Sequence, residues 1–211
     1  MQFVIGKGSE CAKGDACLLL ENRAERESSD MCPADVLILV GIGSNRGDSI
    51  GIVLESVERL RVFARGAVRS SSLWRTSPVD CPPDSGDFVN AVAAFEPRSG
   101  LTPEILLAGL KQMECEFGRE ATPVRNAPRE LDLDLLIYGD ETRVTPQFVL
   151  PHPRATERRF VMAPAAEVAA EFRWPGTEAT VAELLARIED EGTVERLAVG
   201  ARTSSASASS A

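Results

Sequence analysis

Two predicted strands near the middle of the chain follow each other with no helix between them. The first covers 68–76 and alternates apolar with polar residues, and the second covers 88–96. A loop rich in Pro, Asp and Ser, 79–86, joins them. Parallel strands need a long crossover, usually a helix, whereas antiparallel strands are joined by a short loop. This succession therefore argues against a doubly wound sheet and predicts an antiparallel pair.

The remaining elements complete a β-α-β-β-α-β order. Caps followed by apolar stripes predict the helices, and apolar or alternating runs predict the strands. The elements are a strand over 36–42, a helix after Asp48 or Ser49, a helix from Thr102 to Gly118 and a strand over 131–138. The order predicts an α+β fold, a ferredoxin-like antiparallel sheet with helices on one face, in a single domain. Pro164 and the Thr180–Glu183 capping box predict the starts of two later helices.

Composition and charge limit the partners. The chain has 211 residues, of which 32 are acidic and 23 basic, and a net charge of −9. This excess of acidic residues disfavours binding to nucleic acid or to anionic membranes. No apolar run approaches the ~20 residues that a membrane helix needs. The five cysteines lack zinc-like spacing, which indicates reduced thiols in a cytoplasmic protein. We therefore expect small-molecule partners.

The two ends of the chain differ from its middle. Residues 1–33 mix charged residues, Gly and Ser without a period, which predicts a flexible extension. They lack the basic and apolar regions of a secretory signal. Residues 200–211 form a Ser/Ala tail that we expect to be disordered. One domain is thus predicted over 34–199.

Two acidic residues alternate with leucines in the last predicted strand, 131–138. Alternation points Leu131, Leu133 and Leu135 into the core and puts Asp132 and Asp134 on the other face, with Cα atoms roughly 6.5 to 7 Å apart. Like charges on one face repel, so a divalent cation or a basic partner would stabilise them. Two carboxylates with water and phosphates suit magnesium. An exposed face with its charges in water is the alternative.

Basic residues and the single histidine surround this strand. Pro128 restricts the backbone just before Arg129, whose guanidinium suits phosphoryl transfer or an internal salt bridge to Asp132 or Asp134. His152 stands between two prolines and is either a phosphate donor or a surface side chain. Phe160 is either a core residue or a stacking platform.

A glycine-containing segment after the first strand is similar to a dinucleotide-binding turn. In this segment, 41–46, Arg46 occupies the place of the third glycine, which close helix–strand packing requires. The consecutive strands also disagree with a dinucleotide fold. We therefore reject that interpretation.

The motifs together resemble the 6-hydroxymethyl-7,8-dihydropterin pyrophosphokinase family over about 36–188. They are Gly43-Ser44-Asn45, Arg75-Thr76-Ser77-Pro78, Phe88-Val89-Asn90-Ala91, Glu114 with Gly118-Arg119, Pro128-Arg129 with Leu131-Asp132-Leu133-Asp134, Pro151-His152-Pro153 and Arg158 with Phe160. Each motif is weak alone, but their order and spacing together are specific. The resemblance implies a usually monomeric ferredoxin-like transferase of folate biosynthesis, which moves pyrophosphate from ATP to the pterin hydroxymethyl group and releases AMP.

The resemblance also implies roles for individual residues. Two magnesium ions would be held on ATP by Asp132 and Asp134, and the catalytic arginines would be Arg119 and Arg129. ATP binding would involve Lys111, Glu114, Arg129, Leu135, Val149, His152 and Arg158. The pterin would contact Thr76, Pro78, Val79, Asn90 and the aromatic pair Phe88 and Phe160.

The chain departs from the family pattern in one loop. Many members carry Trp and Gly where this chain has Asn126 and Ala127, and a second Arg where it has Ala121. The loop resembles the family's lid, so closure and product release are expected to differ while activity survives.

The function of the protein has two alternatives to the pyrophosphokinase. One is a pterin- or nucleotide-binding module without catalysis, and the other is a purely structural domain.

Overall fold

The computed structural model describes residues 36–78, 81–82, 85–118, 128–146, 148–189 and 192–198. The predicted extension at 1–33 and the predicted tail at 200–211 lie outside these residues. The elements in chain order are β1 (Ile38–Ser44), α1 (Ser49–Arg59), η1 (Leu60–Phe63), β2 (Arg69–Ser70), β3 (Trp74–Thr76), β4 (Phe88–Phe95), α2 (Pro103–Glu116), β5 (Asp132–Tyr138), β6 (Arg143–Val144), β7 (Val149–Leu150), η2 (Ala155–Glu157), α3 (Arg159–Ala169), α4 (Val181–Arg187) and β8 (Val194–Arg196).

The main sheet is antiparallel and has the strand order β5-β1-β4-β3-β8, with β2 also paired to β4. This is the ferredoxin-like arrangement that the order of elements predicts, extended by β8 at one edge. The predicted strand over 68–76 is divided into β2 and β3. The side-chain oxygen of Ser71 accepts a hydrogen bond from the backbone amide of Val92 at this interruption, at 3.0 Å. Between the pairs Ser70↔Ala93 and Trp74↔Asn90, five residues of this segment lie opposite four of β4, so one residue is extra.

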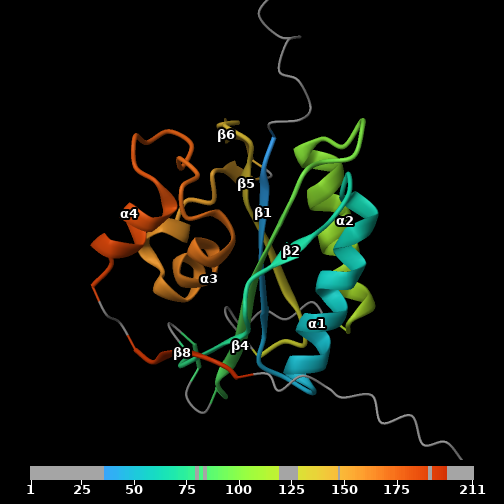
Figure 1. The fold of residues 1–211 in the computed structure, drawn as a ribbon. Helices are drawn as coiled ribbons and strands as arrows, with labels where there is room; N and C mark the ends of the chain where they lie inside the picture. Colours follow the sequence, from blue (N-terminus) through green and yellow to red (C-terminus); the bar gives the residue numbers. More distant parts are fainter. Residues whose placement is uncertain are drawn as a thin grey trace, which may run out of the picture. The chain divides into compact units, whose positions relative to one another are not determined.

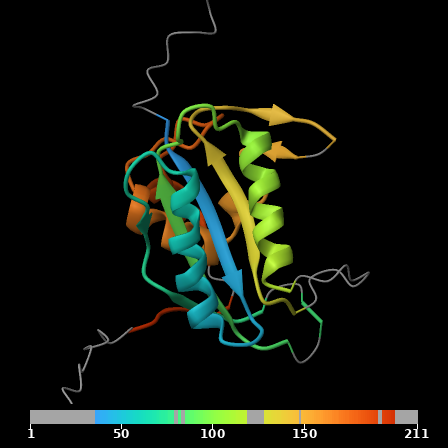
Figure 2. The same cartoon turned by 90° about the vertical axis from the view of Figure 1, so that its right-hand side faces the viewer.

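Helices cover both faces of the sheet. Figures 1 and 2 show α1 and α2 side by side on one face, with α3 on the other. The expectation of helices on one face is therefore incomplete. Alternate residues of β1 explain the difference, because Val40 and Ile42 pack in the cluster under α1 and α2, whereas Leu39 packs with Met162 of α3. A sheet whose two faces are both apolar needs a cover on each.

Capping explains where three of the helices begin. The Asp48 side chain accepts from the amide of Gly51 at α1, and Thr102 caps α2 with Pro103 at the first helical position. Thr180 and Glu183 form the predicted capping box of α4. The predicted start of α3 at Pro164 is wrong, because α3 begins at Arg159 and Pro164 lies inside it.

A β-bulge interrupts the alternation of β5. Leu39 pairs with Ile137 and Val40 pairs with Leu135, which leaves Leu136 as the extra residue. Beyond the bulge, Ile137 packs in the cluster under α3 and Tyr138 in the cluster under α1 and α2. Before the bulge the odd-numbered residues of β5 face α1 and α2, and after it the even-numbered Tyr138 does. Within the described part of the chain, no helix is long and apolar enough to cross a membrane.

Candidate active site

A pocket opens on the α3 face of the sheet, over β1, β4 and β5. Its walls combine carboxylates, arginines, aromatic rings and two glycines. The lining residues are Gly41, Ile42, Gly43, Thr76, Ser77, Cys81, Phe88, Asn90, Ala91, Val92, Arg129, Asp132, Asp134, Leu136, Arg158, Phe160 and Val161. Convergent polar groups in a partly apolar hollow are the usual form of a small-molecule site.

Asp132 and Asp134 both line this pocket. Leu131, Leu133 and Leu135 are buried in the opposite cluster, under α1 and α2. The predicted division of the strand's two faces is therefore confirmed. Within the described ranges, no group of three or more His, Cys, Asp or Glu side chains is placed to hold a metal ion. A cation at the two aspartates would thus take its other ligands from water or from a substrate.

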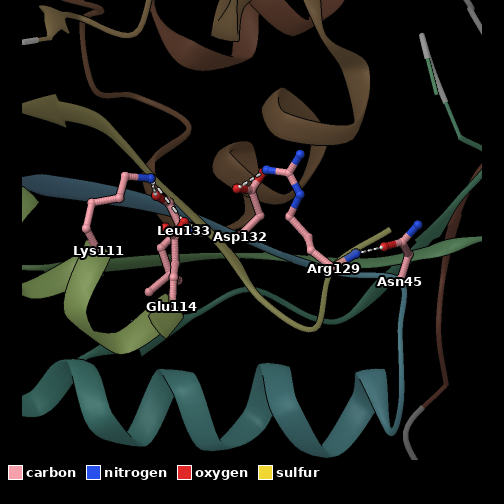
Figure 3. A network of polar contacts seen from close by, with 6 residues as sticks. All are labelled: Asn45, Lys111, Glu114, Arg129, Asp132 and Leu133. Carbon is pink, nitrogen blue, oxygen red and sulfur yellow. Dashed lines mark hydrogen bonds and ion pairs between the residues drawn. The ribbon is translucent and has the colours of Figure 1, made fainter. Parts of the chain in front are cut away.

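Arg129 connects Asp132 with Asn45, the residue that directly follows β1. Its guanidinium donates to Asp132 Oδ1 at 2.8 Å, the internal salt bridge that the sequence left as one alternative. The backbone amide of Arg129 donates to the side-chain oxygen of Asn45 at 2.9 Å. In return, the backbone amide of Asn45 donates to the backbone carbonyl of Arg129 at 3.2 Å. Figure 3 shows the side-chain bond of Asn45 and the ion pair of Asp132 on either side of this arginine. Arg129 is thus fixed through its backbone and its side chain.

Lys111 and Glu114 contact the backbone of β5 from α2. Glu114 is fully buried, and its Oε1 accepts from the Leu133 amide at 2.8 Å and from Lys111 Nζ at 3.0 Å. Lys111 Nζ also donates to the Leu133 carbonyl at 3.3 Å. Figure 3 shows both side chains meeting the strand at this point. The pair therefore holds the one residue that separates Asp132 from Asp134, and it does not line the pocket.

The other end of the pocket is aromatic and amide-lined. Asn90 and Thr76 are buried, and the Asn90 carboxamide Nδ2 donates to Thr76 Oγ1 at 2.7 Å. Phe88 at the start of β4 pairs with Thr76 in the sheet, and Phe160 in the first turn of α3 lines the same pocket. The Arg158 guanidinium lies 5.4 Å from the centroid of the Phe160 ring. Aromatic faces beside a fixed carboxamide suit a flat, polar heterocycle.

His152 lies beside the acidic end, outside the residues that line the pocket. Its backbone amide donates to the Leu136 carbonyl at 2.8 Å, and its Nδ1 accepts from the Arg154 amide at 3.3 Å. Burial lowers the pKa of the imidazole below its ordinary value; the charges of Arg158 and Arg154 act in the same direction, while Asp134 and Asp132 oppose them. The ring is therefore neutral at pH 7, with Nδ1 as acceptor and Nε2 carrying the proton.

Residues 39–170 match the family described as 7,8-dihydro-6-hydroxymethylpterin-pyrophosphokinase (HPPK). The chain belongs to this family. The resemblance and the enzyme class inferred from the motifs are thus confirmed.

Individual HPPK relatives agree with the family match. The 2-amino-4-hydroxy-6-hydroxymethyldihydropteridine pyrophosphokinase of Bacillus subtilis is 39% identical over 141 residues, which cover 66% of this chain and 82% of that protein. The protein of the same name from Pseudomonas aeruginosa is 37% identical over 163 residues, or 76% of this chain and 96% of that protein.

Longer relatives and solved structures also match. The folic acid synthesis protein fol1 of Pneumocystis carinii is 28% identical over 190 residues, 90% of this chain, but the match spans only 25% of fol1. The wild-type HPPK-DHPS structure of Plasmodium falciparum has a TM-score of 0.54 at 13% identity, covering 72% of this chain and 40% of that one. This structural likeness shows the fold, and the predicted ferredoxin-like class is confirmed.

Several residues that the HPPK resemblance singles out lie elsewhere. Leu135 is buried under α1 and α2, so its side chain faces away from the pocket. Val149 is on the exposed hairpin of β6 and β7, and Pro78 is not among the lining residues. Val79 and Arg119 lie outside the described residues. The ligand contacts expected for these residues stay predictions.

The structure adds pocket residues that the sequence analysis did not select. Gly41 and Gly43 belong to the interior of β1, and not to a turn after it. Their spacing of two on a strand is the signal that could have placed both on one face. Cys81 and Ser77 come from the loop after β3, where no pattern indicates which side chains face inward.

Proposed function

We propose that this protein transfers the pyrophosphoryl group of ATP to the hydroxymethyl group of 6-hydroxymethyl-7,8-dihydropterin in folate biosynthesis and releases AMP. One observation supports this proposal most: a single pocket is lined both by the carboxylates Asp132 and Asp134 and by the carboxamide and rings of Asn90, Phe88 and Phe160. Such a pocket can bring a metal-bound polyphosphate and a flat acceptor into contact.

In this proposal the acceptor binds at the aromatic end. Phe88 and Phe160 would stack on the two faces of the pterin, and Asn90, oriented by Thr76, would hydrogen-bond its edge. Holding the acceptor rigidly contributes to catalysis because it replaces a collision between two molecules in solution by an oriented encounter. Pro78 and Val79 belong to the same expected contact set.

The polyphosphate would bind at the acidic end. The donor set of Asp132 and Asp134 suits magnesium, which uses one or two carboxylates and completes its shell with water and phosphate. Two bound ions would neutralise charge on the attacking and leaving oxygens while the pterin oxygen attacks the β-phosphorus. Arg129, Arg158 and the expected Arg119 would hold the phosphates, since planar guanidinium groups match their geometry.

The remaining ATP contacts belong to the same proposal. The Nε2–H group of the neutral His152 ring can donate a hydrogen bond to a phosphate oxygen without adding net charge. Lys111 and Glu114 are the helix residues expected near the nucleotide, and Leu135 and Val149 are those expected to line its base and sugar. Cytoplasmic action as a monomer completes the proposal, and sedimentation of the purified protein tests the oligomeric state.

Product analysis tests the proposed reaction. The protein is incubated with ATP, magnesium chloride and 6-hydroxymethyl-7,8-dihydropterin, and the nucleotide and pterin products are separated by chromatography. AMP and pterin diphosphate in equal amounts are expected. ADP as the nucleotide product contradicts the proposal. Binding of both ligands in calorimetry without any turnover would instead identify a binding module.

A further inference from the structure

Two glycines form the floor of the pocket between its acidic and aromatic ends. In the register of the sheet, Gly43 of β1 lies between Asp132 of β5 and Asn90 of β4. Gly41 likewise lies between Asp134 and Val92. Neighbouring strands are about 4.8 Å apart, so the Cα atoms of Asp132 and Asn90 are roughly 10 Å apart across Gly43.

Backbone conformation does not explain the glycine at position 43. Gly43 does not have a positive φ, so its backbone conformation does not require glycine. No bulge requires it either, because the β1–β5 bulge lies between Leu39 and Val40. Glycine in a strand interior weakens the strand, and it often marks a place where another group approaches closely. A requirement for space is therefore the remaining physical reason.

The group that needs this space is the Asn90 side chain. A Cβ atom on Gly43 would lie 3.0 Å from Asn90 Oδ1, closer than an ordinary contact. On its other side the carboxamide is held by Thr76, through the 2.7 Å bond from Nδ2. Asn90 and Thr76 are only 8% and 2% exposed, and both line the pocket, so a carboxamide displaced from Gly43 would move within the acceptor site. The carboxamide is thus confined between Gly43 and Thr76.

We infer that Gly43 is a positioning residue for the acceptor, which acts by keeping the Asn90 carboxamide in its binding orientation. The inference rests on the proposed function, because Asn90 is the expected polar contact of the pterin. A methyl group at position 43 would turn or shift the carboxamide, and the lost hydrogen bonding would weaken acceptor binding about tenfold. Nucleotide binding at the acidic end would be unaffected.

Gly41 supplies a comparison on the same strand and the same face. The three atoms nearest to a Cβ on Gly41 all belong to Leu136, the closest at 3.4 Å, which is an ordinary van der Waals contact. Gly41→Ala therefore measures what an added methyl group in the pocket floor costs by itself, and Gly43→Ala should raise the Kd of the pterin several-fold more. Both substitutions replace glycine by a residue that is no worse in a strand, so a difference between them reports the site and not the strand.

A double-mutant cycle with Asn90→Ala tests the inference. The pterin and the magnesium complex of AMPCPP, whose α,β-methylene bridge cannot be cleaved by the proposed transfer, are titrated calorimetrically and separately. The proteins are the wild type, Gly43→Ala, Gly41→Ala, Asn90→Ala and the Gly43→Ala/Asn90→Ala double variant. We expect Gly43→Ala to raise the Kd of the pterin about tenfold, to leave the Kd of the nucleotide within twofold, and to cause no further loss once Asn90 is alanine. An effect within twofold, or one that multiplies with that of Asn90→Ala, overturns the inference.

A measurement without ligand separates this inference from the proposed function. The side-chain amide resonances of Asn90 in a ¹⁵N-correlated NMR spectrum should shift in Gly43→Ala while the dispersion of the spectrum shows an intact fold. Unshifted resonances, or a general loss of the fold, overturn the positioning role. A wild-type protein that makes no AMP contradicts the proposed function alone, and one that binds no pterin overturns both.

Discussion

The side-chain oxygen of Asn45 accepts a hydrogen bond from the backbone amide of Arg129, 84 residues further along the chain, at 2.9 Å. Asn45 comes directly after β1, and Arg129 precedes β5, so this bond fixes the arginine where it can reach Asp132. Asn45→Ala removes the acceptor and leaves the amide of Arg129 without it. We expect kcat to fall about tenfold and the free energy of unfolding to fall by about 1 kcal/mol. Asn45→Asp retains an acceptor oxygen and should lose less of both. Steady-state kinetics and urea unfolding of the two variants provide the check, and equal losses would contradict it.

Asp134→Asn should abolish turnover without unfolding the protein, because asparagine keeps the shape of the side chain but loses the charge for the cation. Relief of the repulsion between the two carboxylates should leave the melting temperature equal or higher. Asp140→Asn is the matched control, since Asp140 is exposed in the turn after β5.

A binding readout accompanies this prediction. Magnesium–ATP at one hundred times its Kd should stabilise the wild type by about 2.7 kcal/mol. Chelation with EDTA, or Asp134→Asn, should remove most of that gain, as measured by thermal unfolding. Equal stabilisation with and without magnesium would argue against a cation at this position.

The buried carboxylate of Glu114 forms an ion pair with Lys111. Lys111→Met should lower the free energy of unfolding by about 1–3 kcal/mol, because it removes a cation 3.0 Å from a fully buried carboxylate. Adding Glu114→Gln should restore part of the loss, since glutamine keeps an oxygen for the Leu133 amide. Urea unfolding of the two single variants and the double variant gives the coupling, and strictly additive losses would show that the two side chains act independently.

His152 should make the stability depend on pH in one direction. Its pKa in the folded protein lies below 6.5, the ordinary value, chiefly because burial disfavours the charged ring. Between pH 6.5 and that lower pKa the unfolded chain binds a proton that the folded chain does not. The stabilisation is therefore fully present above pH 6.5 and decreases as the pH falls through this window.

The single histidine of the sequence makes this direct to measure. In protein without a histidine tag, one imidazole resonance titrates in an NMR experiment, and its midpoint should lie below 6.5. His152→Gln should flatten the difference in melting temperature between pH 7.5 and 5.5. A midpoint above 6.5 would mean that Asp134 and Asp132 outweigh the burial.

Local patterns predicted much of this molecule because their physical causes are local. The alternation around Asp132 was enough to assign its face, since a strand has a side-chain period of two. Thr102 and Thr180 identified helix starts for the same reason, because a cap involves residues only three apart. The predicted fold class followed from the order of the elements.

The features that the sequence did not predict depend on contacts between distant segments. The bulge at Leu136 is set by how β5 pairs with β1, and no local signal marks it. Pro164 looks like a helix start, but the chain is already helical from Arg159, so the proline only omits a bond in the second turn. The space at Gly43 exists because Asn90 arrives from another strand.

The last described strand, β8, lies beyond the region that matches the family, yet it forms the edge of the sheet next to β3. The backbone of Thr193 bonds to Ser77 twice, through its carbonyl at 3.0 Å and its amide at 3.1 Å, and Ser77 lines the pocket. A shortened protein that stops after α4 would leave the β3 edge open to pairing with another molecule. It would also release the segment that carries Ser77. A protein expressed only over the residues that match the family would also lack β8, so we expect it to aggregate and to have an altered acceptor site.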